Sequence, residues 1–170
     1  MFWLSERCGK VVGSEVSKKA ILEFFSEHKL EPVSKTFGDF TIYSASNIEI
    51  WQGDFFKLPK QKMPDFDLIY DKAAIVALPP DMRIRYAKKI LSLSSVRTHI
   101  LLHHFTYNQE EMNGPPFSVS QKELKQYFGH AFSLKVIEEN ELSIEKFKKF
   151  QLRGLKSTFI EYLLLLSPIR

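Results

Sequence analysis

The sequence predicts an α/β protein with a mostly parallel sheet that is covered by helices on both faces. Short apolar runs of strand length alternate along the chain with amphipathic segments of helix length, as in folds of this class. The 170 residues are 44% hydrophobic and 26% charged, which is ordinary for a folded globular protein of one-domain length. We therefore expect a single domain over residues 1–170.

The first half of the chain begins with a strand pattern and a helix pattern. Residues 10–16 form a short apolar run that contains an acid near its end, as buried parallel strands often do. Ser17 then offers an N-cap for an amphipathic helix that extends to about residue 28. Residues 40–43 and 47–51 alternate in the manner of strands, with a hairpin turn between them.

The second half continues the alternation. Pro80 precedes apolar residues at helical spacing, and Ser120 with Glu123 forms the sequence pattern of a capping box at the start of another helix. The expected elements are strands at 66–71, 98–107, 132–138 and 156–166, and helices at 80–93 and 120–128.

Composition excludes several classes of protein. The net charge of +4 is spread along the chain, and the densest basic stretch, residues 146–156, is flanked by acids such as Glu145 and Glu161, which indicates a solvated face rather than a nucleic-acid site. Cys8 is the only cysteine, so no intramolecular disulfide can form. No apolar run approaches the ~18 residues that span a bilayer. We expect a soluble, cytoplasmic protein that binds neither nucleic acid nor membrane.

Two stretches have residues suited to a nucleotide. Open α/β sheets that bind nucleotides place an acid at the end of their second strand, where it accepts the ribose hydroxyls, and Glu15 has this position. Glu15 can equally cap the following helix. In Gly53-Asp54-Phe55-Phe56, Asp54 and Phe55 can flank an adenine, or the stretch is a turn with two core aromatic residues.

Two further stretches are suited to a small substrate. Asp71 and Lys72 end a strand at the sheet edge where ligands bind, although Asp71 can also pair with Lys72 or cap a helix. In Gly114-Pro115-Pro116-Phe117 the prolines fix the backbone and can present Phe117 to an apolar ligand, or the loop simply ends a strand. His103 and His104 are adjacent in a strand and point to opposite faces, so we expect structural histidines and no metal site.

These stretches, VVGSEVS, GDFFKLP, YDKAAIVALPPDMRIRYA and GPPFSVSQKELKQYFG, resemble in this order the thiopurine S-methyltransferase family and the bacterial thiol and halide methyltransferases grouped with it. The resemblance implies a Rossmann-like sheet that ends in an antiparallel strand pair, with S-adenosylmethionine as the cofactor. It implies that Glu15 binds the ribose and that Asp54 and Phe55 flank the adenine. Lys72 would lie near the methionine end of the cofactor and near the substrate.

The resemblance also assigns the substrate side and reveals departures. The loop Pro115, Pro116 and Phe117 would lie over the substrate, with Tyr107 nearby. Lys72 stands where the family usually has arginine. It keeps the positive charge but lacks the planar set of donors of a guanidinium. Met1 aligns inside the helix after the family's first strand, so that strand and its glycine-rich cofactor loop have no counterpart, and Cys8-Gly9 replaces a Gly-His pair.

The unmatched strand is central in the family, between the strands that end at Glu15 and Asp71. Three consequences are open: the natural product begins upstream, the two partner strands close up, or another chain fills the gap. We expect a monomer for the complete fold. For the chain that starts at Met1 we expect no competent methyl transfer by itself, with association favoured by unpaired strand edges.

The function implied by the resemblance is transfer of a methyl group from S-adenosylmethionine to the sulfur of a small aromatic or heterocyclic thiol. The alternatives are a truncated or degenerate family member without turnover, and a methyltransferase for halide, selenium or tellurium.

Overall fold

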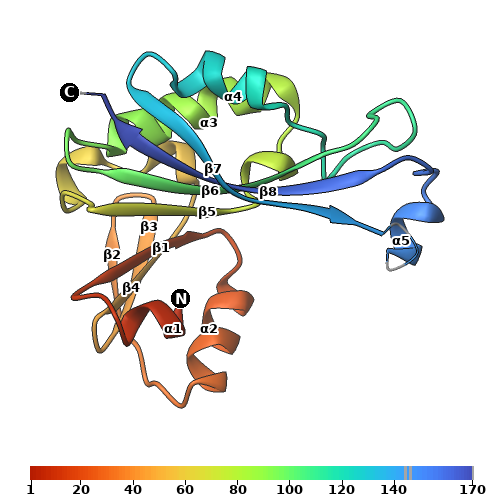
Figure 1. Ribbon diagram of the computed structural model, residues 1–170. Helices are drawn as coiled ribbons and strands as arrows, with labels where there is room; N and C mark the ends of the chain where they lie inside the picture. Colours follow the sequence, from red (N-terminus) through yellow and green to blue (C-terminus); the bar gives the residue numbers. More distant parts are fainter. Residues whose placement is uncertain (144, 146, 170) are drawn as a thin grey trace. The chain divides into compact units, whose positions relative to one another are not determined.

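The computed structural model in Figure 1 describes residues 1–143, 145 and 147–169. Ile144, Lys146 and Arg170 lie outside the described residues, so the basic stretch proposed from the sequence is described without Lys146. The chain divides into two compact units, which we call the first unit (Met1–Pro59) and the second unit (Lys60–Arg170). Each unit contains its own four-stranded sheet.

The first unit has a mixed sheet in the order β1-β4-β3-β2. Strand β1 pairs in parallel with β4, while β3 pairs in antiparallel fashion with β4 and with β2. The elements of this unit are α1 (Phe2–Ser5), β1 (Val11–Glu15), α2 (Lys18–Glu27), β2 (Val33–Phe37), β3 (Phe40–Ala45), β4 (Ile48–Gln52) and the short 3-10 helix η1 (Phe55–Lys57).

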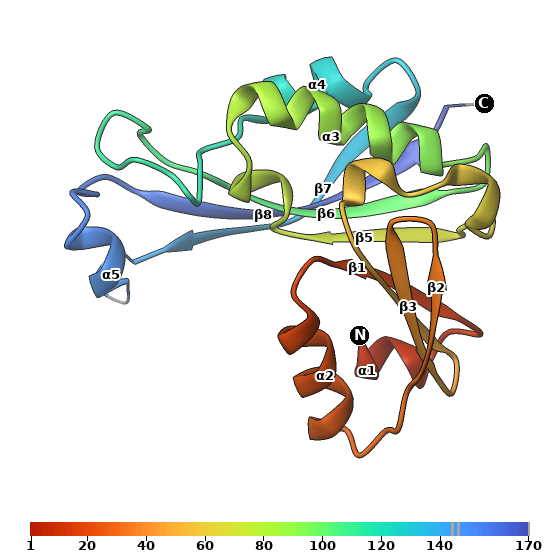
Figure 2. The same cartoon turned by 180° about the vertical axis from the view of Figure 1, so that it is seen from behind.

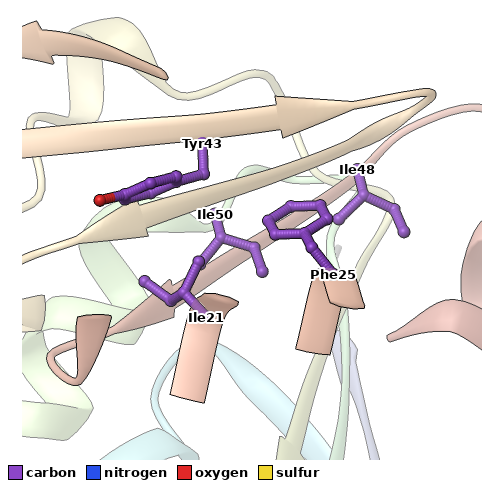
Figure 3. Close-up of a cluster of buried hydrophobic side chains, with 5 residues drawn as sticks. All are labelled: Ile21, Phe25, Tyr43, Ile48 and Ile50. Carbon is purple, nitrogen blue, oxygen red and sulfur yellow. The ribbon is translucent and has the colours of Figure 1, made fainter. Parts of the chain in front are cut away.

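Helix α2 and the sheet of the first unit share a core of buried side chains. Figure 3 shows two residues of α2 pointing toward side chains of β3 and β4. The five residues are Ile21, Phe25, Tyr43, Ile48 and Ile50. The helix begins as predicted, because the Ser17 hydroxyl accepts a hydrogen bond from the Ala20 N–H at 3.2 Å. This core packs α2 against β3 and β4.

The second unit has a sheet in the order β5-β6-β8-β7, in which β5 and β6 are parallel and the other pairs antiparallel. Figures 1 and 2 show α3 and α4 on the same face of this sheet. The elements are the 3-10 helix η2 (Lys60–Lys62), β5 (Leu68–Lys72), the 3-10 helix η3 (Ile75–Ala77), α3 (Pro80–Leu93), β6 (His99–Thr106), α4 (Gln121–Phe128), β7 (Phe132–Leu142), α5 (Lys148–Gln151) and β8 (Phe159–Pro168).

Most of the predicted elements are confirmed, including both ends of α3 and the antiparallel pair β7–β8. The expectation of a mostly parallel sheet is wrong, because only two of the described strand pairs are parallel. Strands joined by connections as short as those of β2–β3 and β3–β4 can only run antiparallel. Strand β2 was not predicted, because Lys35 lies between its two apolar residues, Val33 and Phe37, and interrupts the apolar pattern; all five residues of the strand are exposed.

Strands β1 and β5 belong to different sheets, one in each unit. None of the described helices is long and apolar enough to cross a membrane.

Candidate functional site

The Glu15 carboxylate lies at the end of β1, beside the turn that leads into α2. Its Oε1 accepts hydrogen bonds from the N–H groups of Val16 at 2.7 Å and Ser17 at 2.8 Å. The capping alternative for Glu15 is therefore present in the structure. The cap uses only Oε1, and no donor among the described residues bonds to Oε2. Capping by Oε1 and binding of a ribose hydroxyl by Oε2 are thus compatible.

The turn after β4 places Asp54 next to the end of β1. The Gly53 N–H donates to the Glu15 carbonyl at 3.0 Å, which continues the parallel pairing of the two strands. The Asp54 carboxylate accepts a hydrogen bond from the Phe56 N–H at 2.9 Å and caps η1. Gly53 is required by packing, because a Cβ at this position would lie 2.5 Å from the Phe40 ring.

The residues at this edge fit the adenosine half of a nucleotide cofactor. Glu15 and Asp54 come from adjacent ends of two parallel strands, and each uses one carboxylate oxygen for its local cap. The Phe55 ring is half-buried and meets the Phe56 ring edge-on, with centroids 5.9 Å apart. Acceptor oxygens for hydroxyl and amino groups beside an aromatic face are what a ribose and an adenine require.

Asp71 is buried at the end of β5 and does not pair with its neighbour Lys72. Its carboxylate accepts hydrogen bonds from the Ala74 N–H at 2.6 Å and from the Tyr86 hydroxyl of α3 at 3.0 Å. Burial raises the pKa of Asp71 from 3.8 to about 6, although both hydrogen bonds act to lower it. Asp71 therefore serves as a buried cap that connects β5 to α3.

Lys72 is exposed and points to the opposite face of the sheet, where it lines a hollow of about 180 Å³. Six of the seven lining residues carry a polar or charged group, and the hollow is at the carboxyl end of β5, where open α/β sheets bind ligands. The lining residues are Tyr70, Lys72, His103, Glu138, Asn140, Glu161 and Leu163. His103 Nε2 lies 2.7 Å from Glu161 Oε1, whereas the Lys72 ammonium has no ion-pair partner in the described part of the chain.

Tyr107 is buried and holds the loop that was predicted to cover a substrate. Its hydroxyl donates to the Pro116 carbonyl at 2.6 Å, and its backbone N–H donates to the Ser118 hydroxyl at 3.0 Å. Burial raises the pKa of Tyr107, so the hydroxyl remains a donor at neutral pH. Tyr107 thus helps to fix the position of Pro116 through this hydrogen bond.

Phe117 is half-buried and lies 5.8 Å from the Arg83 guanidinium, measured to the ring centroid. Its N–H donates to the Val76 carbonyl at 2.6 Å. Arg83 in turn binds the Glu123 carboxylate at 2.9 Å and the Ser118 carbonyl at 3.3 Å. The Ser120 hydroxyl accepts from the Glu123 N–H at 3.1 Å, as the capping box predicts, while the Glu123 side chain binds Arg83.

The predicted residues therefore form three groups. Glu15, Asp54 and Phe55 are in the first unit, at the ends of β1 and β4. Lys72 lines the hollow of the second unit, and the loop Tyr107, Pro115, Pro116 and Phe117 lies beyond the end of β6 and is not among the residues that line this hollow. His103 with Glu161 and Arg83 with Glu123 were not predicted, because each pair joins residues far apart in sequence.

His104 has the structural role expected for it. Its Nδ1 donates to the Val119 carbonyl at 2.8 Å, and its ring stacks on Tyr162 with centroids 5.0 Å apart. Burial lowers the pKa of His104 to about 4, so the ring is neutral near pH 7. His103 points to the other face, as predicted. Among the residues that the structure describes, no cluster of His, Cys, Asp or Glu could hold a metal ion.

Comparison with known sequences gives one consistent result. The profile of the family described as thiopurine S-methyltransferase matches residues 1–165. A thiopurine S-methyltransferase of Pseudomonas fluorescens is 36% identical over 151 residues, which cover 89% of this chain and 69% of that protein. A probable thiopurine S-methyltransferase of Yarrowia lipolytica is 39% identical over 158 residues, covering 92% of this chain and 72% of that protein.

Comparison with solved structures supports the same fold. The YcgJ protein from Bacillus subtilis aligns with a TM-score of 0.67 at 12% identity, covering 99% of this chain and 87% of that chain. A SAM-dependent methyltransferase from Anabaena variabilis aligns with a TM-score of 0.62 at 13% identity, covering 98% and 71%. The predicted α/β methyltransferase fold class is thereby confirmed.

Proposed function

The chain belongs to the thiopurine S-methyltransferase family of S-adenosylmethionine-dependent S-methyltransferases, and on that premise we propose that it methylates the sulfur of a small aromatic or heterocyclic thiol. The observation that carries the choice of acceptor is the Lys72 ammonium. It is an exposed cation without an ion-pair partner in the described residues, and it lines a hollow at the carboxyl end of β5. A cation at this position favours a thiolate over a thiol.

The first unit provides the groups for the cofactor. Bound S-adenosylmethionine would supply a methyl group that is already activated on a sulfonium centre. We assign Glu15 Oε2 to the ribose hydroxyls and the unbonded carboxylate oxygen of Asp54 to the adenine amino group, with Phe55 against the ring. Support for these roles comes from the two carboxylates at adjacent strand ends, each with one oxygen used locally.

The second unit provides the groups for the acceptor. A thiolate is a strong nucleophile, so the protein needs to align it, hold it in its charged form and exclude water. We assign the charge stabilisation to Lys72. We assign the exclusion of water to Pro115, Pro116 and Phe117, which do not line the Lys72 hollow but are connected by the Phe117 N–H to the carbonyl of Val76, four residues after Lys72. Tyr107 keeps this loop in place through its bond to the Pro116 carbonyl.

The test is a transfer assay with labelled S-adenosylmethionine and thiophenol. It is run on residues 1–170, on the same chain extended at its N-terminus by the corresponding segment of the Pseudomonas fluorescens relative, and on variants of Lys72 in both forms. Reversal of the charge in Lys72→Glu should lower the rate at least tenfold, because a carboxylate repels the thiolate. Lys72→Arg should retain or raise the rate, since arginine keeps the charge and adds a fork of donors. Lys88→Glu is the matched control, because Lys88 is an exposed lysine of α3.

Each outcome decides between the alternatives. Equal rates for wild type and Lys72→Glu would remove Lys72 from the acceptor site. Absence of transfer by wild type would favour a family member without turnover. Transfer to iodide but not to thiophenol would favour the halide alternative.

A further inference from the structure

The loop that joins β6 to α4 is bonded to a segment about forty residues further along the chain. Arg153 lies in the basic stretch that the sequence analysis interpreted as a solvated face. Its guanidinium donates from Nη1 to the Pro115 carbonyl at 2.8 Å and from Nη2 to the Asn113 carbonyl. A planar guanidinium is suited to binding two acceptors at once, so one side chain holds the backbone on both sides of Gly114.

A second charged residue makes the reverse connection, from the loop to the segment. Glu111 Oε2 accepts hydrogen bonds from the backbone N–H groups of Lys156 and Ser157, both at 2.7 Å. These two bonds are the largest cause of a lowered pKa for Glu111, so the carboxylate stays charged at neutral pH. We call Arg153, Glu111 and the backbone groups that they bind the clasp.

The backbones of the two segments approach closely inside the clasp. Gly154 has φ +107, and a Cβ on it would lie 2.5 Å from the Glu111 carbonyl oxygen. Met112 and Leu155 are buried beside this contact in one cluster with Tyr107 and Phe159. The charged bonds of the clasp therefore surround an apolar contact and fix one register between the two segments.

The clasp holds residues 113–115 at the tip of the loop, which the hydrogen bonds of Tyr107 and Val76 do not contact. Pro116 and Phe117 are held by Tyr107 and by the Val76 carbonyl, both in the body of the second unit. Asn113 and Pro115 are exposed, and Arg153 is the residue whose side chain bonds to both of their carbonyls. The position of the loop tip thus depends on the clasp.

We propose that Arg153 and Glu111 are positioning residues for the methyl acceptor. They fix the tip of the loop 113–117 so that Pro115 and Phe117 form a wall for an aromatic thiol. This inference rests on the proposed function, which assigns the loop to the acceptor. The affinity for the acceptor should depend on the clasp, while the affinity for the cofactor, whose assigned residues are in the first unit, should not.

The experiment measures two affinities and the exchange of backbone amide hydrogens in the full chain. Arg153→Ala should weaken binding of para-nitrothiophenol about tenfold, the loss expected for two hydrogen bonds that order the loop. Binding of S-adenosylhomocysteine should be unchanged, and amide exchange within residues 108–116 should become faster. Arg153→Lys should recover part of the acceptor affinity, because lysine can donate to one of the two carbonyls.

Glu111 offers a closely matched control. Glu111→Gln keeps an acceptor oxygen for the two N–H groups and should resemble wild type, whereas Glu111→Ala should resemble Arg153→Ala. Glu110→Ala removes the same charge from the adjacent residue, whose carboxylate bonds to no described residue, and should change neither affinity.

The outcomes separate the clasp from the proposed function. Unchanged exchange or unchanged thiol affinity in Arg153→Ala would overturn the positioning role. Equal weakening of cofactor and thiol would also overturn it and indicate a general loss of structure. If wild type binds the thiol but transfers no methyl group, the proposed function fails. The thiol and cofactor affinities of wild type and Arg153→Ala still show whether the clasp positions the loop. If wild type binds no thiol, both proposals fail.

Discussion

The strand-end turns of Glu15 and Asp54 and the loop between β6 and α4 are held in place in different ways. The carboxylates of Glu15 and Asp54 bond to backbone N–H groups one or two residues further along the chain. The loop is bonded to Arg83 and Arg153, which are 35 and 38 residues away from their partners in it. The turns therefore depend on residues adjacent in the chain, whereas the loop depends on contacts with distant parts of the second unit.

This difference separates two kinds of substitution. A change at the strand-end turns should alter local structure or ligand binding with a small effect on folding. A change in the buried long-range bond between Arg83 and Glu123 should lower the stability of the second unit, because the charged Arg83 side chain that remains is buried without its partner. The following predictions test that separation, beginning with the largest expected effect.

Glu123→Ala should destabilise the second unit by roughly 3 kcal/mol, the lower end for breaking a buried ion pair. The Arg83 side chain is only 4% exposed, against 22% for Glu123, and it would keep the Ser118 carbonyl as its one bonded acceptor. Urea unfolding of wild type and variant measures the loss. The double variant Arg83→Met with Glu123→Leu should recover most of it, because no charge is left unpaired. A loss below ~1 kcal/mol would show that this pair contributes no more to stability than a surface ion pair does.

The sequence predicted those parts of the molecule that depend on neighbours in the chain. The ends of α3, the Ser17 cap and the Ser120 cap each follow from residues within four positions, and all three are confirmed. Glu15 had two interpretations, and the structure contains the local one. The partners of Arg83 and Arg153 could not be predicted, since topology alone brings residues 35 to 40 positions apart into contact.

Asp71 is intermediate between the two regions, with one hydrogen-bond donor three residues away and one fifteen residues away. Its pKa is raised to about 6, so between about pH 4 and pH 6 the folded state binds more protons than the unfolded state. Stability should therefore fall as pH rises through this window and level off above it. A shift of about two pKa units corresponds to roughly 3 kcal/mol at most.

Asp71→Asn should remove this pH dependence. The amide oxygen can still accept from the Ala74 N–H, and the amide N–H can donate to the Tyr86 hydroxyl, so no polar group loses its partner. Urea unfolding at several pH values from 4 to 7 measures the slope in each protein. Asp65→Asn, at an exposed carboxylate, is the control and should keep the wild-type slope. A slope that persists in Asp71→Asn would assign the pH dependence to another group.

The smallest effect on folding is expected at Glu15, where the question is whether the local cap is its whole role. If Oε2 binds the ribose, Glu15→Ala should weaken binding of S-adenosylhomocysteine by about 1.5–3 kcal/mol, the usual range for hydrogen bonds to a charged group. Ser17→Ala removes a cap of the same helix but no proposed ligand contact. It should cost about 1 kcal/mol of stability and leave the affinity unchanged. Calorimetry measures the affinity of both variants, and urea unfolding measures their stability. If Glu15 only caps the helix, both variants should lose stability and keep the wild-type affinity. Loss of affinity in Glu15→Ala alone would show that the carboxylate serves the helix through one oxygen and the cofactor through the other.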